Sequence, residues 1–341
     1  MTYPWRWYAD PDVLRAEQER IFARTWQYVG HAGQVAEVGD YFTAQLGRIP
    51  VVVTHAEDDE LRAFANVCRH RGSLVADGPG NRRTLQCPYH ARTYGLDGGL
   101  RSAPRADFDP AEISLASLRL DRWGPFLFAN ADVDAAVLAD VLGEVPQQVA
   151  DAGIDVDELR FHHRADWTIE ANWKLVSENF LECYHCAVAH PGFTAMVDVS
   201  PESYRLEADG LVSSQFGALR ENGSAPYDAG GEVPRGQFHF LFPNTGLNIF
   251  PGRANVSIGP IIPAGPERTA RFLDYFFAAD ADEAWIAELL AFDDQIGRED
   301  TALVERAQAG AGAGAVESGR LLGESERLVA HFQQLLRDAL S

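Results

Sequence analysis

The chain has 341 residues, of which 46% are hydrophobic and 23% are charged, and this composition fits a soluble globular protein with room for two domains. Its formal net charge of −21 argues against a nucleic-acid partner, because phosphate backbones are bound by clustered Lys and Arg. The opening residues lack the uncharged apolar core of a signal peptide, and no later stretch approaches the ~18 apolar residues of a membrane span. We therefore expect a cytoplasmic protein without a membrane partner.

An N-terminal helical segment is predicted within residues 1–36. Leu14, Ile21 and Phe22 fall at roughly helical spacing, and Asp10 before Pro11 provides a capping residue followed by a proline in the first turn. We expect this segment to pack on the C-terminal domain.

Two domains are predicted after it, and together they make an α+β protein. Residues 37–130 contain short β-rich runs broken by Gly, Asp and Pro, as in a small antiparallel β domain. Residues 131–341 begin with a linking helix and continue with apolar runs that suggest an antiparallel sheet flanked by helices. The expected elements are helices over 132–153, 281–309 and 324–340, strands over 159–168, 238–242, 246–250, 254–263 and 268–277, and a flexible join at 310–315.

A first cluster of metal-type ligands lies in the β domain. Cys68 and His70 are separated by roughly 16 residues from Cys87 and His90, so that each short motif offers one thiolate and one imidazole. Structural zinc fingers usually pair Cys with Cys and His with His. The mixed pattern suits a [2Fe-2S] cluster held by two Cys on one iron and two His on the other, with a zinc site as the alternative.

A second cluster lies between Asn172 and Phe193, where Glu182, His185 and His190 offer a carboxylate and two imidazoles to a single metal ion, with Asn179 and Tyr184 beside them. On a regular helix the two imidazoles would lie about 140° apart, so both reach one metal only if the helix distorts or ends nearby. Pro191 favours an ending. The alternative is a pair of core or surface histidines without a metal.

Two cysteines enclose one of these histidines. Cys183 and Cys186 flank His185, and without an export signal we expect reduced thiols packed under the site, not a thioredoxin-like redox pair.

At these motifs the sequence resembles the Rieske non-haem iron oxygenase α subunits. The segments CRH and CPYH match the family's two Rieske motifs, with a departure at Ala91 and Arg92, where Gly and Trp are common. The run from Asn179 to His190 matches its N-x-x-[DE]-x-x-H-x4-H segment. The resemblance implies a Rieske domain followed by a catalytic domain of the helix-grip type. It also implies that the [2Fe-2S] ligands are Cys68, His70, Cys87 and His90, and that His185 and His190 bind a mononuclear Fe(II).

The same resemblance suggests roles for two acids. Asp300 lies in a segment that resembles the family's C-terminal ligand helix, and it is the expected third iron ligand. Glu182 would connect His185 to His90 of a neighbouring subunit. Spacing alone leaves four rivals to Asp300, namely Asp293, Asp294, Glu299 and Glu305.

The implied function is O2-dependent hydroxylation of a small organic substrate, with N-demethylation where the hydroxylated carbon is an N-methyl. Electrons from NAD(P)H would arrive through a separate flavin or ferredoxin-type reductase, and the family's electron route implies a homotrimer. The C-terminal half looks most like the choline, glycine betaine and carnitine oxygenase branch, with aromatic-ring dihydroxylation as the second substrate class. A Rieske electron carrier and a zinc-binding module are the remaining alternatives. Alternating apolar residues on strands more often belong to the core than to a pocket. With that alternative, the candidate residues of the substrate wall are Phe193, Met196, Phe216, Phe238, Phe240, Phe242, Asn248 and Phe250.

Overall fold

The computed structural model describes residues 2–341 and divides into two compact units. One unit combines the chain up to Glu17 with Ala139–Ser341, and the other is Gln18–Leu138. Within the described range, no helix combines the length and the apolar character needed to cross a membrane. The domain bounds predicted at residues 36 and 130 stay a prediction.

The unit Gln18–Leu138 is built on two antiparallel sheets, ordered β1-β10-β9-β4-β3-β2-β5 and β6-β7-β8. Alternate side chains such as Val51 and Val53 are fully buried in one core, and Tyr94 and Leu100 belong to a second core around the cysteines. Its elements are η2 (Gln18–Phe22), β1 (Gln27–His31), η3 (Ala32–Val35), β2 (Asp40–Leu46), β3 (Ile49–His55), β4 (Leu61–Ala65), β5 (Gly80–Asn81), β6 (Thr84–Gln86), β7 (Thr93–Gly95), β8 (Leu100–Ser102), η4 (Pro110–Glu112), β9 (Ser117–Trp123) and β10 (Phe126–Asn130).

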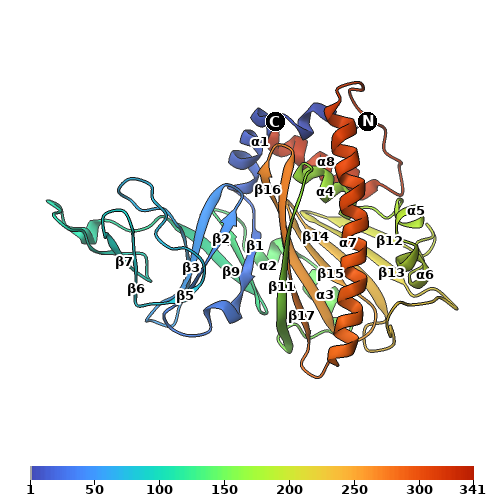
Figure 1. The fold of residues 1–341 in the computed structure, drawn as a ribbon, viewed down its shortest axis with the longest axis horizontal. Coiled ribbons are helices and arrows are strands. Elements are labelled where there is room, and N and C mark those ends of the chain that lie inside the picture. Colours follow the sequence, from blue (N-terminus) through green and yellow to red (C-terminus); the bar gives the residue numbers. More distant parts are fainter. Residues whose placement is uncertain (1) are drawn as a thin grey trace. The chain divides into compact units, whose positions relative to one another are not determined.

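The other unit is built on one seven-stranded antiparallel sheet, ordered β11-β17-β16-β15-β14-β13-β12, with helices packed against it (Figure 1). Its elements are η1 (Trp5–Tyr8), α1 (Pro11–Glu17), α2 (Leu138–Leu142), α3 (Val145–Ala150), β11 (Leu159–Ile169), α4 (Trp173–Phe180), α5 (Cys186–Ala189), α6 (Pro191–Met196), β12 (Arg205–Asp209), β13 (Val212–Ala218), β14 (Arg235–Leu241), β15 (Thr245–Ile249), β16 (Asn255–Gly265), β17 (Arg268–Ala278), α7 (Glu283–Gly312) and α8 (Arg327–Leu340). Together with the other unit's sheets, this arrangement confirms the predicted α+β class.

The long helix α7 runs along one face of this sheet (Figure 1). It begins at Asp282, whose side chain accepts hydrogen bonds from the backbone N–H groups of Ala284 and Trp285, as an N-cap does. Ile286, Leu289 and Phe292 recur at helical spacing and are buried against aromatic residues of the sheet. This apolar stripe fixes the helix on the sheet and so fixes the acidic residues that follow it.

Helix α4 is held by buried polar contacts with the N-terminal residues. The Nζ of Lys174 lies 2.7 Å from Glu17, and both side chains are fully buried. Trp173 donates to the same carboxylate, and Tyr8 donates to Glu178 near the end of the helix. Because an unpaired buried charge is costly, these contacts fix where α4 ends and the next segment starts.

Some predicted elements differ from the structure for local reasons. The helix predicted over 132–153 is two helices, since Gly143 between them has a φ of +52°. The join at 310–315 begins inside α7, which continues to Gly312. Strands β12 and β13 were not predicted, and they complete the sheet as an edge pair.

Candidate metal centres

The segment between Trp173 and Met196 is three short helices instead of one. Helix α4 begins at its N-cap Asn172 and ends at Phe180, and a turn leads to α5. His190 then ends α5 and precedes α6, which has Pro191 in its first turn. These interruptions meet the condition for two histidines five residues apart to face one point.

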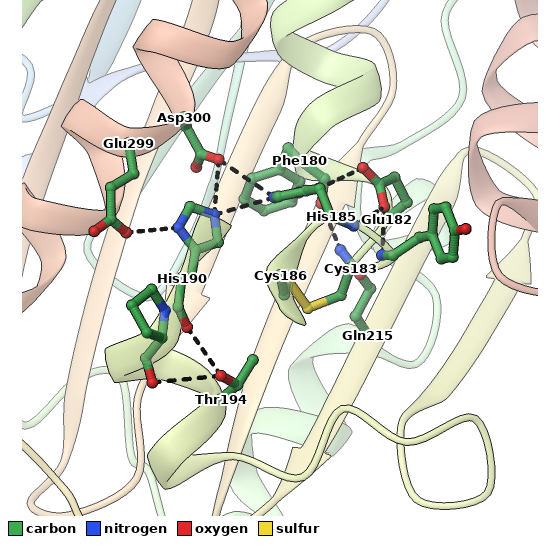
Figure 2. The surroundings of a disulfide bond; sticks show 12 residues. Phe180, Glu182, Cys183, His185, Cys186, His190, Thr194, Gln215, Glu299 and Asp300 are labelled. Carbon is green, nitrogen blue, oxygen red and sulfur yellow. Dashed lines mark hydrogen bonds and ion pairs between the residues drawn. A yellow bond between two sulfur atoms is a disulfide. The ribbon is translucent and has the colours of Figure 1, made fainter. Parts of the chain in front are cut away.

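Two imidazoles and one carboxylate converge at that point (Figure 2). The Nε2 atoms of His185 and His190 are 3.1 Å apart, and Asp300 Oδ1 lies 3.4 Å from the first and 3.0 Å from the second. Asp300 comes from α7, more than a hundred residues later in the chain. Two His and one carboxylate on one side of a point form the facial arrangement that suits non-haem Fe(II) and leaves positions open.

Each imidazole is held from behind by a second carboxylate (Figure 2). Glu182 is hydrogen bonded to Nδ1 of His185 and also accepts from the backbone N–H of His185 at 3.2 Å. Glu299 lies 2.7 Å from Nδ1 of His190. Such partners keep the proton on Nδ1 and leave the Nε2 lone pair for a metal.

The carboxylates also set the charge of the rings. Burial disfavours the charged imidazolium, but the hydrogen bond with Asp300 and the contacts with Glu182 outweigh it and raise the pKa of His185 to about 9. The pKa of His190 is also raised, for the same kind of reason. Burial would raise the pKa of Asp300, yet its bonds to the two imidazoles lower that pKa. A bound cation would replace protons in this network.

The four rival acids have other partners. Glu299 orients His190, and Asp293 accepts a 2.6 Å hydrogen bond from the hydroxyl of Tyr275. Asp294 pairs with an arginine one turn along the same helix, and Glu305 accepts from a backbone N–H that precedes α4. Among these five acids, only Asp300 reaches both Nε2 atoms. Its role as a ligand stays a prediction, which this geometry supports.

The prediction of two separate thiols around His185 is wrong. Cys183 and Cys186 form a disulfide, with their Cα atoms 5.0 Å apart (Figure 2). The expectation assumed a helix through both residues, whereas the turn before α5 brings the sulfur atoms together. The Cys186 sulfur lies near both imidazoles, but a disulfide sulfur is not a thiolate and is not counted as a ligand.

The first cluster forms a compact site at the ends of β4 and β6. Cys68 and Cys87 are buried and free, while His70 and His90 are exposed, with ring centroids 4.6 Å apart. The hydroxyl of Tyr94 lies 3.3 Å from the sulfur of Cys68. An inner pair of thiols beside an outer pair of imidazoles fits the mixed ligand set of a Rieske cluster.

One departure from the family motif, Ala91 where Gly is common, lies in a loop of this site. Ala91 has a φ of +54°, a left-handed conformation that glycine adopts more easily, and its N–H donates to the carbonyl of Cys87. Burial raises the pKa of the Cys87 thiol, but the backbone N–H groups of Tyr89 and His90 lower it below its usual value. The loop therefore keeps the N–H groups that favour a thiolate at Cys87.

A cavity of about 590 Å³ adjoins the convergence point of His185, His190 and Asp300. Of the predicted wall residues, Phe193, Phe238, Asn248 and Phe250 line it, and the others are buried outside it. Cavity-lining residues that were not predicted include Trp167, Tyr204, Gln215, Arg271 and Tyr275. Alternation along the strands could have suggested the aromatic members, but no local pattern identifies Arg271 or Gln215.

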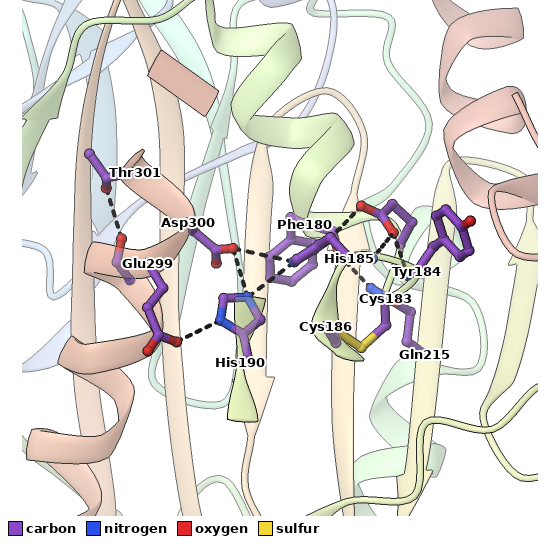
Figure 3. Close-up of polar contacts among 12 residues, drawn as sticks. Phe180, Cys183, Tyr184, His185, Cys186, His190, Gln215, Glu299, Asp300 and Thr301 are labelled. Carbon is purple, nitrogen blue, oxygen red and sulfur yellow. Dashed lines mark hydrogen bonds and ion pairs between the residues drawn. A yellow bond between two sulfur atoms is a disulfide. The ribbon is translucent and has the colours of Figure 1, made fainter. Parts of the chain in front are cut away.

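The two remaining predicted residues lie differently. Asn179 lines the cavity from the last turn of α4. Tyr184 is 65% exposed, and its ring points away from Asp300 and His190 (Figure 3). The structure therefore does not bring Tyr184 into the cavity.

Comparisons with known proteins show the family of the chain. The family model described as ring hydroxylating alpha subunit (catalytic domain) matches residues 156–341, and the Rieske [2Fe-2S] domain model matches residues 25–115. Choline monooxygenase of Beta vulgaris is 32% identical over 351 residues, covering 100% of this chain and 77% of the relative. The oxygenase subunit of carnitine monooxygenase from Escherichia coli K12 is 32% identical over 350 residues, covering 98% of this chain and 92% of the relative.

One solved structure is similar over its whole length. It is a quaternary ammonium Rieske monooxygenase, described in terms of carnitine oxidation by gut microbiota and inter-subunit electron transfer. The TM-score is 0.89 at 30% identity, with 100% of this chain and 95% of the other covered.

Proposed function

The chain belongs to the Rieske non-haem iron oxygenase α subunits, and on this premise we propose that it oxidises a small quaternary ammonium compound with O2. The observation that carries the proposal is the convergence of His185, His190 and Asp300 beside a cavity with aromatic walls. The Rieske domain implies a [2Fe-2S] cluster, and the catalytic domain implies a mononuclear iron.

The residues present fit both groups. Cys68, His70, Cys87 and His90 would hold the cluster, and His185, His190 and Asp300 would hold the iron. When bound, the two groups supply the electrons and the O2 activation that oxidise a substrate C–H bond. The protein itself keeps a proton on Nδ1 of both His185 and His190, so that each Nε2 stays directed at the convergence point.

We assign Glu182 the link between the two centres. Its carboxylate is hydrogen bonded to His185 and is only partly buried, so one side remains accessible. His90 is exposed on its own unit and could meet Glu182 of a neighbouring copy in a homotrimer. A separate reductase would supply electrons from NAD(P)H.

The substrate class follows from the relatives and from the cavity. Both curated relatives carry the names of quaternary ammonium substrates, choline and carnitine. In this chain, the rings of Phe193, Phe238 and Phe250 form a chain of edge-to-face contacts at 5.6–5.8 Å along the cavity. Aromatic faces attract a cation that has left water, so these rings are suited to a quaternary ammonium group. Its N-methyl groups would then pack against the apolar wall of the cavity.

The test is O2 uptake by the purified protein with a reductase, against choline, glycine betaine, carnitine and aromatic acids. We expect a red-brown protein, uptake that depends on a quaternary ammonium compound, and an oxidised or N-demethylated product. Uptake coupled to product only with aromatic acids would replace this proposal with aromatic-ring hydroxylation. A colourless protein that contains zinc would exclude the oxygenase.

A further inference from the structure

Arg271 is a cation that lines the cavity and makes no direct ion pair. It lies on β17 opposite Trp167 of β11, and its guanidinium carbon is 5.4 Å from the centre of the Trp167 ring. Its Nε is buried and makes no hydrogen bond, and no carboxylate within residues 2–341 lies at ion-pair distance from it. Burial lowers the pKa of Arg271, and the nearby carboxylates of Asp300 and Asp293 act against that effect through space. Neither carboxylate pairs with the guanidinium directly, so its hydrogen-bond donors remain available to a ligand in the cavity.

A neighbouring arginine shows the difference. Arg164, on the adjacent strand β11, makes two hydrogen bonds of 2.6 and 2.7 Å with the fully buried Asp274 of β17. The fold therefore supplies a carboxylate to this arginine of the sheet. For Arg271, which lines the cavity, no carboxylate within residues 2–341 makes such hydrogen bonds, although Asp293 and Asp300 act on its charge through space.

Gln215 gives a second, independent observation of the same kind. Its side chain is 2% exposed and lines the cavity, and its Nε2 donates to the carbonyl of Phe180 (Figure 3). Because that carbonyl can only accept, the orientation of the amide is fixed, and Oε1 is left as a buried acceptor without a donor. Both unpartnered atoms thus belong to residues of one cavity, which calls for a polar ligand there.

We infer that Arg271 binds a carboxylate of the substrate, so that the preferred substrates are zwitterions with a quaternary ammonium at one end and a carboxylate at the other. The guanidinium can meet a carboxylate with two parallel hydrogen bonds. The aromatic rings of Phe193, Phe238 and Phe250 are then left for the cation, and choline, which has no carboxylate, leaves Arg271 unpaired. The quaternary ammonium part of this inference rests on the proposed function.

The test is equilibrium binding to the holoprotein, with γ-butyrobetaine, its methyl ester and choline as probes. The ester keeps the shape and the cation but loses the negative charge. We expect γ-butyrobetaine to bind about 100-fold more tightly than its ester, as removal of a charged hydrogen-bond pair would give. Arg271→Gln should remove this difference without weakening the binding of choline, because a positive charge is taken away from a site that holds a cation, and Arg271→Lys should restore part of the difference.

Arg268→Gln is the matched control. Arg268 lies on the same strand, is exposed, and faces Glu170 at 3.4 Å, so its loss should change none of the three affinities. Equal binding of the zwitterion and the ester by the natural protein would overturn the inference. Loss of choline together with γ-butyrobetaine in Arg271→Gln would also overturn it, because it would show a structural role.

A different result would separate this inference from the proposed function. If no quaternary ammonium compound binds, but benzoate binds and is lost in Arg271→Gln, the proposed substrate class fails while Arg271 remains the carboxylate site. If γ-butyrobetaine and choline bind equally well and both are oxidised, the proposed function holds and the role of Arg271 fails.

Discussion

The imidazole pairs of the two candidate metal centres have similar geometry and opposite surroundings. The rings of His70 and His90 are 4.6 Å apart and those of His185 and His190 are 5.0 Å apart, both close to edge-on. Burial together with nearby positive charge, chiefly from Arg92, lowers the pKa of His70. Carboxylates surround the second pair and raise the pKa of both rings.

The groups around each histidine pair determine which kind of metal site the pair suits. Within residues 2–341, no hydrogen bond or ion pair joins either ring of the first pair to a carboxylate, and both rings lie near the surface. In the second pair, carboxylates bond to Nδ1 of both rings and a third carboxylate meets both Nε2 atoms. The first pair is suited to a cluster that accepts and passes on electrons, and the second pair to a dication with open positions.

The largest effect is expected from replacing Asp300, the carboxylate that contacts both imidazoles of the second pair. Asp300→Ala is expected to abolish mononuclear iron binding and turnover, because within residues 2–341 no other acid reaches both Nε2 atoms. Iron analysis and the visible spectrum would check this, since the Rieske absorption should remain. Glu288→Ala, an exposed acid on the same helix, serves as the control. Retained iron at this site would contradict the assignment of Asp300.

The next largest effect is expected for the carboxylate behind His185. Glu182→Gln should keep both metals and lower turnover by more than about 100-fold, because the amide keeps the size of the side chain but loses the charge that couples the centres. Metal content and single-turnover reduction of the iron would be measured. Normal turnover would mean that Glu182 does not connect the two centres.

The corresponding carboxylate behind His190 should matter less. Glu299→Gln is expected to weaken iron binding or activity by about 10- to 100-fold, the usual loss for a residue that only orients a ligand. An iron titration beside that of Glu182→Gln separates orientation from coupling. Equal turnover losses in the two variants would remove the distinction between the two acids.

Acid should affect the two histidine pairs unequally. The pKa of His185 is raised to about 9, so its ring is protonated at neutral pH, and a metal must displace that proton. Displacement of this one proton should therefore make the iron affinity rise by about tenfold per pH unit from pH 6.5 to 8.5. The pKa of His70 is lowered, so retention of the cluster should change little over this range. Titrations of Fe(II) at three pH values, with the visible spectrum recorded, would test both statements.

The smallest effect is expected from the positive surroundings of the first pair. Arg92→Gln removes a charge that lowers the pKa of His70, so the pKa should rise and the reduction potential of the cluster should fall. The fall should be less than about 59 mV, a tenfold change in a one-electron equilibrium. A redox titration would measure it, and a higher potential would contradict the electrostatic reading.

The two sites also differ in how far the sequence predicts them. The residues of CRH and CPYH lie on short neighbouring loops, so spacing alone indicates which side chains meet. His185 and His190 were predicted with Asp300 through a resemblance, because no local pattern connects positions more than a hundred residues apart. The hydrogen bond between Glu299 and His190 depends on how α7 is rotated about its own axis against the sheet. The hydrophobic periodicity of the sequence does not determine that rotation.

The errors have physical causes of the same kind. The disulfide between Cys183 and Cys186 was missed because a continuous helix was assumed where the backbone turns. Arg271 was not identified because a single basic residue in an apolar strand usually reaches the surface, and only the assembled sheet shows that its guanidinium stays inside.

Helix α7 makes the centre sensitive to changes in chain length. Asp293, Glu299 and Asp300 lie on one uninterrupted helix. Asp293 contacts Tyr275, whereas Glu299 and Asp300 contact the two ring nitrogens of His190. One inserted residue between Phe292 and Gly297 would turn all that follows by about 100° and advance it by about 1.5 Å. It would remove the contacts of Glu299 and Asp300 together, although every side chain is still present. Insertions and deletions in this part of α7 are therefore expected to be tolerated less than any single substitution.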